Sequence, residues 1–537
     1  MSDTTIQGGA VNAPDKQSDF AELEDFSALD ARARGALLCS IIVVALCGIV
    51  YELIIGSVSS YLLGDSVTQF SITIGFFMFA MGIGSFVSQF IRRRLIETFI
   101  LVEIALAIIG GLCSIGLFLA FPFAPTLYQT IMLSFILAIG ALVGLEIPLL
   151  TRILAQGGGT RKSIANVMSL DYVGALVGSV AFPLLLLPNL GLVRASFAIG
   201  IANVFVALAT IYFVRTRLPA APRLAAMAAA VLAALIVLML AGSRLSGFAQ
   251  HHLYFDDVIW SKQSQYQSLI ITRDRRKSDL RLFIDGHLQF AQSDEHRYHE
   301  ALVHPVMSHP GARASVLVLG GGDGLAVREL LKYDDVAHID LVDLDPEMTR
   351  LGSSFAPLVA LNDNALADPR VHVHNQDAFV FIRQTDRRYD RVIIDMPDPH
   401  DAVLSKLYAV EFYEMIRRSL SPDGVVVTQA SSPFFARRTF WSIGATMDAV
   451  FADTAAYNIS IPSFGVWGFH LAAATPNRLA VEPAINVATR YWSEELMPSA
   501  KVFPADIGPT AEATVNSIFE PTLFRLYQED MRQRLKS

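Results

Sequence analysis

Cysteine is scarce in this chain and absent after residue 113. The 537 residues include three cysteines, Cys39, Cys47 and Cys113, each within an apolar stretch. No disulfide framework and no thiolate metal site can be built from them, so we expect small buried side chains. A basic excess is also missing, because the net charge is −8. Nucleic acid is therefore not expected as a partner, whereas a cationic substrate is compatible with this charge.

Charged residues are rare between residues 36 and 241, where only 16 of 206 positions carry one. Residues 1–35 hold seven acidic and three basic side chains, and residues 242–537 hold 66 charged side chains in 296 positions. The last value is typical of a soluble protein. The sequence therefore predicts an acidic tail (1–35), a transmembrane domain (36–241) and a soluble region (242–537).

Seven apolar runs approach or exceed the ~20 residues that a helix needs to cross a bilayer. They lie near residues 36–63, 67–91, 98–120, 126–150, 170–190, 195–214 and 224–241. The first run starts too late and is too long for a cleaved signal peptide. We therefore expect a multi-pass membrane protein, with the lipid bilayer as a partner.

Lys and Arg are unevenly distributed among the loops between these runs. The three even-numbered loops carry nine, and the three odd-numbered loops carry only Arg194. The positive-inside rule places the even loops and the tail in the cytoplasm, and seven spans then place residues 242–537 outside. The seventh run is the shortest. If it lay in the membrane interface, the soluble region would be cytoplasmic, and both placements stay open.

Three carboxylates, Glu52, Glu103 and Glu146, fall inside the apolar runs. Charge is costly there and usually faces a cavity or a partner. One interpretation is a polar path or a binding site for a cation. The other is a structural carboxyl group that is protonated or paired with a neighbour such as Arg152.

The soluble region combines a β pattern with alternating strands and helices. Residues 266–272 and 280–284 flank a polar turn and predict a hairpin, followed by a helix from 294 to about 308. Short apolar runs at 315–319, 338–342, 371–374, 391–395 and 424–428 then alternate with helical stretches. We expect a small β module (242–300) followed by an α/β domain (301–537) with a doubly wound, mostly parallel, methyltransferase-like sheet.

A glycine-rich turn, Gly320-Gly321-Gly322-Asp323-Gly324, follows the first of these strands. Glycines there let a nucleotide approach the backbone, and Asp343, at the end of the next strand, is placed to bind ribose hydroxyls. Asp323 sharpens the prediction. The α-carboxylate of S-adenosylmethionine would be repelled by a buried aspartate, whereas an ammonium would be attracted.

Two further motifs follow later strands. Asp377 is placed to accept a hydrogen bond from an adenine amino group. Asp395 and Asp398, in Asp395-Met396-Pro397-Asp398-Pro399, leave a buried strand end together, and proline turns the chain away from the ladder. A carboxylate pair is equally typical of a turn or a helix cap, but this pair lies where the fold places its site.

With these motifs in order, the sequence resembles the spermidine synthase (polyamine aminopropyltransferase) family, in its membrane-extended bacterial form. The resemblance spans residues 254–476 and includes Gln265-Tyr266-Gln267, the stretch from Asp285 to Phe290, the stretch from Asp294 to Glu300, the glycine turn with Arg328-Glu329, and the Asp377 and Asp395 motifs. It implies transfer of the aminopropyl group of decarboxylated S-adenosylmethionine to a diamine such as putrescine. The products would be spermidine and methylthioadenosine.

The resemblance also implies the roles of nine residues. Asp395 would be the catalytic base; Gln267, Asp323, Asp343, Asp377 and Ala378 would bind the donor; Tyr298, His299 and Asp398 would line the track of the acceptor amine. No metal and no cofactor is implied, since the sulfonium donor is a co-substrate, and a homo-oligomer is compatible with the resemblance.

Two departures from the family pattern lie on the loop that closes over the acceptor. The family continues its second Asp-Pro with Gly-Pro, whereas Pro399 is followed here by His400-Asp401-Ala402. Met396-Pro397 also replaces a small hydroxyl pair. Two alternatives stay open: a methyltransferase using S-adenosylmethionine, which Asp323 disfavours, and a non-catalytic membrane transporter or sensor of polyamines.

Overall fold

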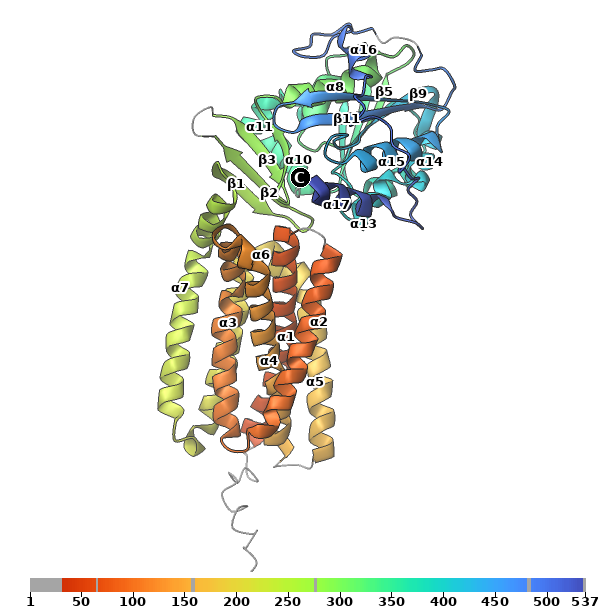
Figure 1. Ribbon diagram of the computed structural model, residues 1–537. Coiled ribbons are helices and arrows are strands. Elements are labelled where there is room, and N and C mark those ends of the chain that lie inside the picture. Colours follow the sequence, from red (N-terminus) through yellow and green to blue (C-terminus); the bar gives the residue numbers. More distant parts are fainter. Residues whose placement is uncertain (1–30, 64–65, 156–159, 275–277, 481–483, 535–537) are drawn as a thin grey trace, which may run out of the picture. The chain divides into compact units, whose positions relative to one another are not determined.

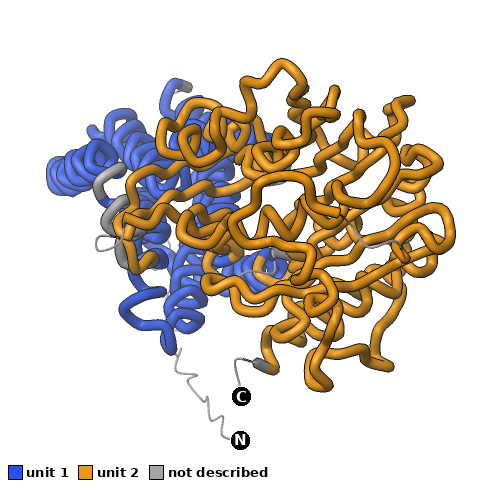
Figure 2. Tube along the Cα trace, turned by 90° about the horizontal axis from the view of Figure 1, so that it is seen from above, with its two compact units in different colours: residues 1–59, 70–246 blue, residues 60–69, 247–537 orange. Residues whose placement is uncertain are grey.

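The computed structural model describes residues 31–534 except 64–65, 156–159, 275–277 and 481–483 (Figure 1). Most of the predicted acidic tail lies outside this range. The chain forms two compact units, one of residues 1–59 and 70–246 and the other of residues 60–69 and 247–537 (Figure 2).

The first unit is a helical bundle. Its long helices are α1 (Ala31–Leu63), α2 (Ser66–Val87), α3 (Leu95–Phe123), α4 (Tyr128–Ala155), α5 (Thr160–Ala181), α6 (Leu187–Val214) and α7 (Ala221–Leu253). Shorter turns are η2 (Ser88–Phe90), η3 (Pro125–Leu127), the π-helix η4 (Phe182–Leu186) and η5 (Arg215–Arg217). Successive long helices run in opposite directions, so the chain enters the bundle at one end and α7 leaves at the other (Figure 1).

Six helical stretches of the described residues are long and apolar enough to cross a membrane. One of them, Ser163–Arg217, has 55 residues and would be about 80 Å long as a straight helix, enough for two crossings. Gly191, near the start of α6, has a non-helical φ of 68° and breaks this stretch into two helical segments. The seven predicted runs therefore correspond to seven helices.

The seventh predicted run lies within helix α7, and its crossing of the membrane stays a prediction. Helix α7 starts at Ala221, and its stretch Ala221–Gly242 has the highest mean hydropathy of the six. Arg223 is compatible with this start because it lies in the first turn, where a long side chain can reach polar surroundings.

The second unit begins with a four-stranded antiparallel sheet of β1 (Asp257–Gln263), β2 (Ser268–Arg273), β3 (Leu280–Ile284) and β4 (His287–Ala291). The predicted hairpin is present, because β2 pairs with β3 in antiparallel register. Helices α10 (Pro346–Ser354) and α11 (Ala356–Leu361) pack against this sheet, with Met348 and Leu358 in the same apolar cluster as Leu269 and Leu282.

A seven-stranded sheet forms the centre of the second unit. Its strands, in spatial order, are β10 (Asp453–Ile461), β11 (Gly465–Ala473), β9 (Leu420–Gln429), β8 (Tyr389–Asp395), β5 (Ser315–Gly320), β6 (His338–Asp343) and β7 (Val371–Asn375). The last five are parallel, and β11 and β10 extend the sheet with antiparallel pairing. The expected mostly parallel, doubly wound sheet is confirmed. Two antiparallel strands were not predicted.

Helices cover both faces of this sheet. Val316 and Val318 of β5 belong to one apolar cluster, and Leu317 and Leu319 belong to another, because side chains alternate along a strand. The first face is covered by α8 (Glu295–Ser308) and α9 (Leu325–Leu330). The second is covered by α12 (Ala378–Gln384), α14 (Val410–Ser419), α15 (Arg437–Asp448) and α17 (Leu523–Arg534).

The remaining short elements are η6 (Ala365–Ala367), α13 (Ala402–Ser405), η7 (Lys406–Tyr408) and α16 (Leu496–Ala500).

Strand order reverses between β5 and β8, because β6 and β7 continue to one side of β5 while β8 and β9 lie on the other. Ligands of such sheets bind at the carboxyl ends of the strands beside this point. The boundary at residue 300 between two soluble subdomains stays a prediction.

Candidate active site

A cavity of about 580 Å³ lies at the carboxyl ends of the parallel strands. Its wall includes the glycine turn after β5, Asp343 at the end of β6, Asp377 after β7 and Asp395 at the end of β8. Residues of the antiparallel sheet and its turns, among them Gln267 between β1 and β2, close another side. The volume suits a small-molecule ligand, for which cavities of about 300–1,000 Å³ are usual.

The glycine turn brings the backbone against two carboxylates. Gly320 pairs with Asp395 in the sheet register and has φ +85°, and a Cβ atom there would lie 2.0 Å from the main-chain oxygen of Asp395. A Cβ atom on Gly321 would lie 3.2 Å from Asp395 Oδ2, and one on Gly322 would lie 2.5 Å from Asp343 Oδ2. Only glycine fits this close approach.

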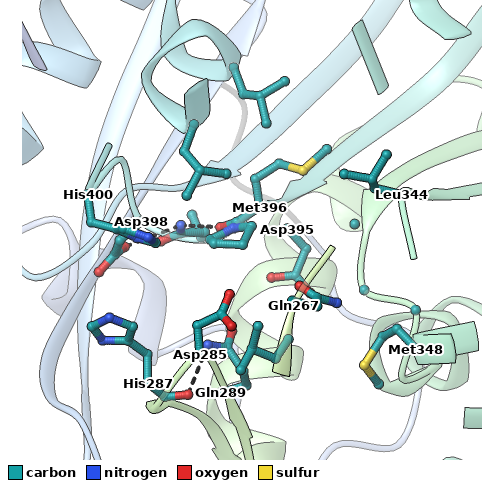
Figure 3. A pocket seen from close by; sticks show the side chains of 18 of the residues that line it. Gln267, Asp285, His287, Gln289, Leu344, Met348, Asp395, Met396, Asp398 and His400 are labelled. Atoms are coloured by element: carbon teal, nitrogen blue, oxygen red, sulfur yellow. Dashed lines mark hydrogen bonds between the residues drawn. The ribbon is translucent and has the colours of Figure 1, made fainter. Parts of the chain in front are cut away.

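Asp395 receives a hydrogen bond from a buried phenol. The Tyr298 hydroxyl donates to Asp395 Oδ1 over 2.5 Å. Burial raises the pKa of Asp395 to about 6, while the positive charge of His299 and the Tyr298 hydrogen bond act in the opposite direction. Asp395, Met396 and Gln267 are among the labelled residues that line the cavity in Figure 3.

The His299 ring is fixed by a hydrogen bond to Glu295, which forms a buried ion pair with Arg328. Its Nδ1 lies 2.9 Å from Glu295 Oε2, and both carboxylate oxygens of Glu295 accept from the Arg328 guanidinium. Burial alone would lower the pKa of His299, but the hydrogen bond and charge of Glu295 raise it above its usual value. The family motifs thus place a fixed imidazole in the cavity wall beside Tyr298.

Two more aspartates carry backbone hydrogen bonds that fix their position. Asp323 Oδ1 accepts from the Leu325 amide at 2.9 Å, and burial raises the pKa of Asp323. Asp343 accepts from the amides of Gly322 and Asp345, each at 2.9 Å, and burial raises its pKa to about 6. Both carboxyl groups are therefore pre-positioned, and an incoming cation would stabilise their ionised forms.

Asp398 is surrounded by donors from distant parts of the chain. Its Oδ2 accepts from the Ser431 hydroxyl at 3.2 Å and the Tyr527 hydroxyl at 3.0 Å. Gln429 donates to Oδ1 at 3.4 Å. Burial nevertheless raises the pKa of Asp398.

Asp377, predicted to accept a hydrogen bond from an adenine amino group, already has partners for both carboxylate oxygens. Its Oδ1 caps α12 by accepting from the Phe379 amide at 2.7 Å. Its Oδ2 forms an ion pair with Lys406 Nζ at 2.8 Å. Burial opposes ionisation, but Lys406 lowers the pKa of Asp377. A ligand could use only the remaining lone pairs of these oxygens.

Several cavity residues were not assigned a role from the sequence. The imidazole rings of His287 and His400 lie 5.3 Å apart between centroids, and both line the cavity near Asp285 and Asp398 (Figure 3). His287 lies in the family motif from Asp285 to Phe290, and His400 is one of the departures from the family pattern. The sequence therefore marked the segments that hold both residues. Nothing in the sequence indicated that Tyr527 belongs to the site, since it lies on an amphipathic helix 129 residues from its partner Asp398.

All nine predicted site residues line this one cavity: Gln267, Tyr298, His299, Asp323, Asp343, Asp377, Ala378, Asp395 and Asp398. Eight aspartates contribute to the wall, but the only lysine or arginine in it is Lys406. Such a wall is electrostatically suited to a ligand with more than one positive charge. Within the described residues, no group of three or more His, Cys, Asp or Glu side chains is arranged to hold a metal ion.

Known proteins resemble this chain over nearly its whole length. The Spermine/spermidine synthase domain matches residues 295–482. "Polyamine aminopropyltransferase 1" of Streptomyces coelicolor is 42% identical over 94% of this chain and 96% of its own. "Polyamine aminopropyltransferase" of Mycobacterium tuberculosis is 38% identical over 89% of this chain and 93% of its own.

Among solved structures, spermidine synthase from Thermotoga maritima is 26% identical, with a TM-score of 0.42, over 46% of this chain and 84% of its own. The matches to the Streptomyces coelicolor and Mycobacterium tuberculosis proteins cover 94% and 89% of this chain, so they extend into the helical unit. The chain belongs to the polyamine aminopropyltransferase family.

Proposed function

We propose that the cavity transfers the aminopropyl group of decarboxylated S-adenosylmethionine to a diamine such as putrescine. The observation that carries this proposal is the cavity wall, with eight aspartates around a glycine turn at the strand switch point. The donor carries a sulfonium and an ammonium, and the acceptor carries two ammonium groups. As a member of this family, the chain is an aminopropyltransferase whose substrates are polycations.

The donor occupies the side of the cavity formed by β5, β6 and β7. Asp343 binds the ribose hydroxyls, with its orientation fixed by the Gly322 amide. Gln267 and Ala378 bind the nucleoside, and Asp377 contributes the lone pairs that α12 and Lys406 leave unused. Asp323 binds the ammonium at the end of the aminopropyl chain, where S-adenosylmethionine itself would place a carboxylate as well.

The reaction is a direct displacement at the aminopropyl carbon bonded to sulfur. The acceptor ammonium loses a proton to Asp395, and its nitrogen lone pair forms the new C–N bond. The C–S bond breaks, and its electron pair neutralises the sulfonium to give methylthioadenosine. The product nitrogen keeps a positive charge, so one proton is released overall. No metal or redox group takes part.

The base and the amine have mismatched acidities. A primary ammonium has a pKa of about 10.4, and the pKa of Asp395 is about 6, so proton transfer in the ground state costs about 6 kcal/mol. That cost fits within the barrier of about 16–17 kcal/mol of an enzyme turning over a few times per second. In-line positioning of the two substrates then supplies much of the acceleration.

The acceptor occupies the side lined by Tyr298, His299 and Asp398. Asp398, held by Ser431 and Tyr527, binds the distal ammonium of the diamine. His287 and His400 lie at this side of the cavity and limit the length of the acceptor. The identity of the preferred amine depends on these two rings, because the family has glycine in the motif where this chain has His400.

The decisive experiment is turnover by purified full-length protein. With decarboxylated S-adenosylmethionine and putrescine, we expect spermidine and methylthioadenosine in equal amounts. A panel of amines from propane-1,3-diamine to cadaverine and agmatine ranks the acceptors. Formation of S-adenosylhomocysteine from S-adenosylmethionine, without methylthioadenosine, would instead support a methyltransferase. Amine binding without turnover would support a sensor or transporter.

We also propose that the helical unit spans the bacterial inner membrane seven times. Large apolar side chains are exposed on its helices, including Phe79 and Phe86 on α2, Leu176 on α5 and Leu240 on α7. A surface of this kind suits lipid better than water. The loop charges then orient residues 1–35 to the cytoplasm and residues 247–537 to the opposite side. Oligomerisation stays a prediction.

A further inference from the structure

Two glutamates are fully buried in the helical unit, and neither has a cationic partner among the described residues. Glu103 of α3 and Glu146 of α4 have no exposed surface. Apart from each other, their carboxyl groups have no hydrogen-bond partner in the described part of the chain. The pairing of Glu146 with Arg152, one of the two interpretations above, is not formed, because the Arg152 guanidinium donates to the main-chain oxygens of Ser88, Ile91 and Pro148.

Other unpartnered polar groups lie along the same inner face of α3. Glu103, Gly110 and Ser114 are spaced 7 and 4 residues apart, so they share one face of the helix. The Ser114 hydroxyl is buried without a hydrogen-bond partner among the described residues. The Tyr51 ring of α1 lies over Gly110, where a Cβ atom would be 2.4 Å from its Cζ, and the buried Tyr51 hydroxyl also lacks a partner in the described chain.

Helix α6 adds an amide to this face. A Cβ atom on Gly200 would lie 2.8 Å from the Ala107 oxygen, so α3 and α6 touch there. The helices are antiparallel, and Asn203, one turn beyond Gly200, therefore lies within about one turn of the level of Glu103. Asn203 is 1% exposed, and neither atom of its amide has a partner among the described residues.

Glu103 and Glu146 are neighbours inside the helical unit. The two carboxyl groups face one another closely enough to interact, and both act electrostatically on Tyr51. Burying an unpaired carboxylate is unfavourable by several kcal/mol, and such groups in apolar helices face a cavity, a partner or a transported ion. The described residues supply no cationic partner, so the pair is neutralised either by a shared proton or by a cation from outside the chain.

We propose that Glu103 and Glu146 bind one ammonium group of a linear polyamine inside the helical unit, with Asn203, Tyr51 and Ser114 facing the rest of its chain. The distance from Glu103 to Ser114 along α3 is about 16 Å, which suits an extended polycation rather than a compact ion. The choice of a polyamine rests on the activity proposed above. The helical unit would then receive a substrate or product of the catalytic unit, and Tyr51 would leave its place over Gly110 to admit it.

The test is the number of spermidine molecules bound by purified full-length protein in equilibrium dialysis with radiolabelled spermidine. We expect two per chain for the parent protein and one for the Glu103→Gln/Glu146→Gln double variant. Glu97→Gln is the matched control, since Glu97 is on the same helix but is paired with Arg94, and it should keep two. Turnover of all three proteins should agree within about twofold.

A parent protein that turns over but binds a single spermidine, which the double variant retains, would overturn the proposal and would indicate that the glutamate pair holds only a shared proton. Retention of both molecules by the double variant would overturn it too. Tyr51→Phe guards against misfolding, because it should weaken the second binding event by about three- to tenfold while leaving the thermal unfolding profile unchanged. Failure of the catalytic proposal is distinguishable, since it would appear as absent turnover in the parent protein.

Discussion

Tyr298 donates a hydrogen bond to Oδ1 of Asp395 over 2.5 Å, from helix α8 to the end of strand β8. This hydrogen bond stabilises the ionised carboxylate of Asp395, which burial alone would disfavour. The pair therefore keeps a base available at neutral pH. Its geometry follows from the sheet register, which pairs Asp395 with Gly320 and directs its carboxyl group past the glycine turn.

Replacing Tyr298 by Phe should move the acid limb of the pH profile. The pKa of Asp395 is about 6 with the hydrogen bond present, and the bond lowers it, so its removal raises the pKa. The base works only when deprotonated, so kcat/KM of Tyr298→Phe should begin to fall at a higher pH than in the parent enzyme. Profiles from pH 5 to 9 measure this. An unchanged or lower limb would mean that Asp395 is not the titrating base.

The Asp323 carboxylate should set the choice of donor. The parent enzyme should bind decarboxylated S-adenosylmethionine more tightly than S-adenosylmethionine, and Asp323→Asn should reduce this preference by about tenfold to a hundredfold, the scale of a charged hydrogen bond. Calorimetric titration of both ligands measures the two ratios. Equal binding of both ligands to the parent protein would contradict the electrostatic argument.

The ring of His400 should limit the acceptor. Replacing it by glycine, the residue usual in the family motif, removes one of two rings 5.3 Å apart at the acceptor side. We expect kcat/KM for cadaverine relative to putrescine to rise by about tenfold, within the range that a changed pocket wall allows. Binding of methylthioadenosine serves as the control and should stay the same. If the acceptor ranking does not change, the length limit lies elsewhere.

Seven crossings should place a reporter fused after Ser243 outside the cytoplasm. A phosphatase that is active only in the periplasm should therefore be active at this position, and a fusion after Arg94, in a basic loop, should be inactive. Activity after Ser243 would require a supply of donor on the outer side. The reverse result would return the catalytic unit to the cytoplasm and leave α7 as an interfacial helix.

Much of the fold was predictable because its local patterns are strong. Apolar runs of about 20 residues marked the helical unit, and short apolar strands ending in Gly320, Asp343 and Asp395 marked the sheet and its site. Strands β10 and β11 were missed, since antiparallel strands that follow a βα series carry no glycine or aspartate motif.

The site was less predictable where its contacts join distant segments. Family motifs located all nine residues, but the sequence offered no reason to connect Asp398 with Tyr527, or Asp377 with Lys406. The ion pair of Glu295 with Arg328 is a similar case, because both residues stand in recognised motifs whose mutual contact depends on how α8 packs beside α9. Such pairings are set by tertiary packing, which periodicity does not encode.

The proposed role of Asp395 is tested most directly by single-turnover formation of methylthioadenosine in Asp395→Asn. The substitution keeps the size of the side chain but removes the base, so the rate should fall by about 10²- to 10⁴-fold, while the Kd of decarboxylated S-adenosylmethionine changes by less than about threefold. Asp334→Asn, at an exposed aspartate, should react at the parent rate. A rate for Asp395→Asn within about threefold of the parent would contradict the assignment of the base.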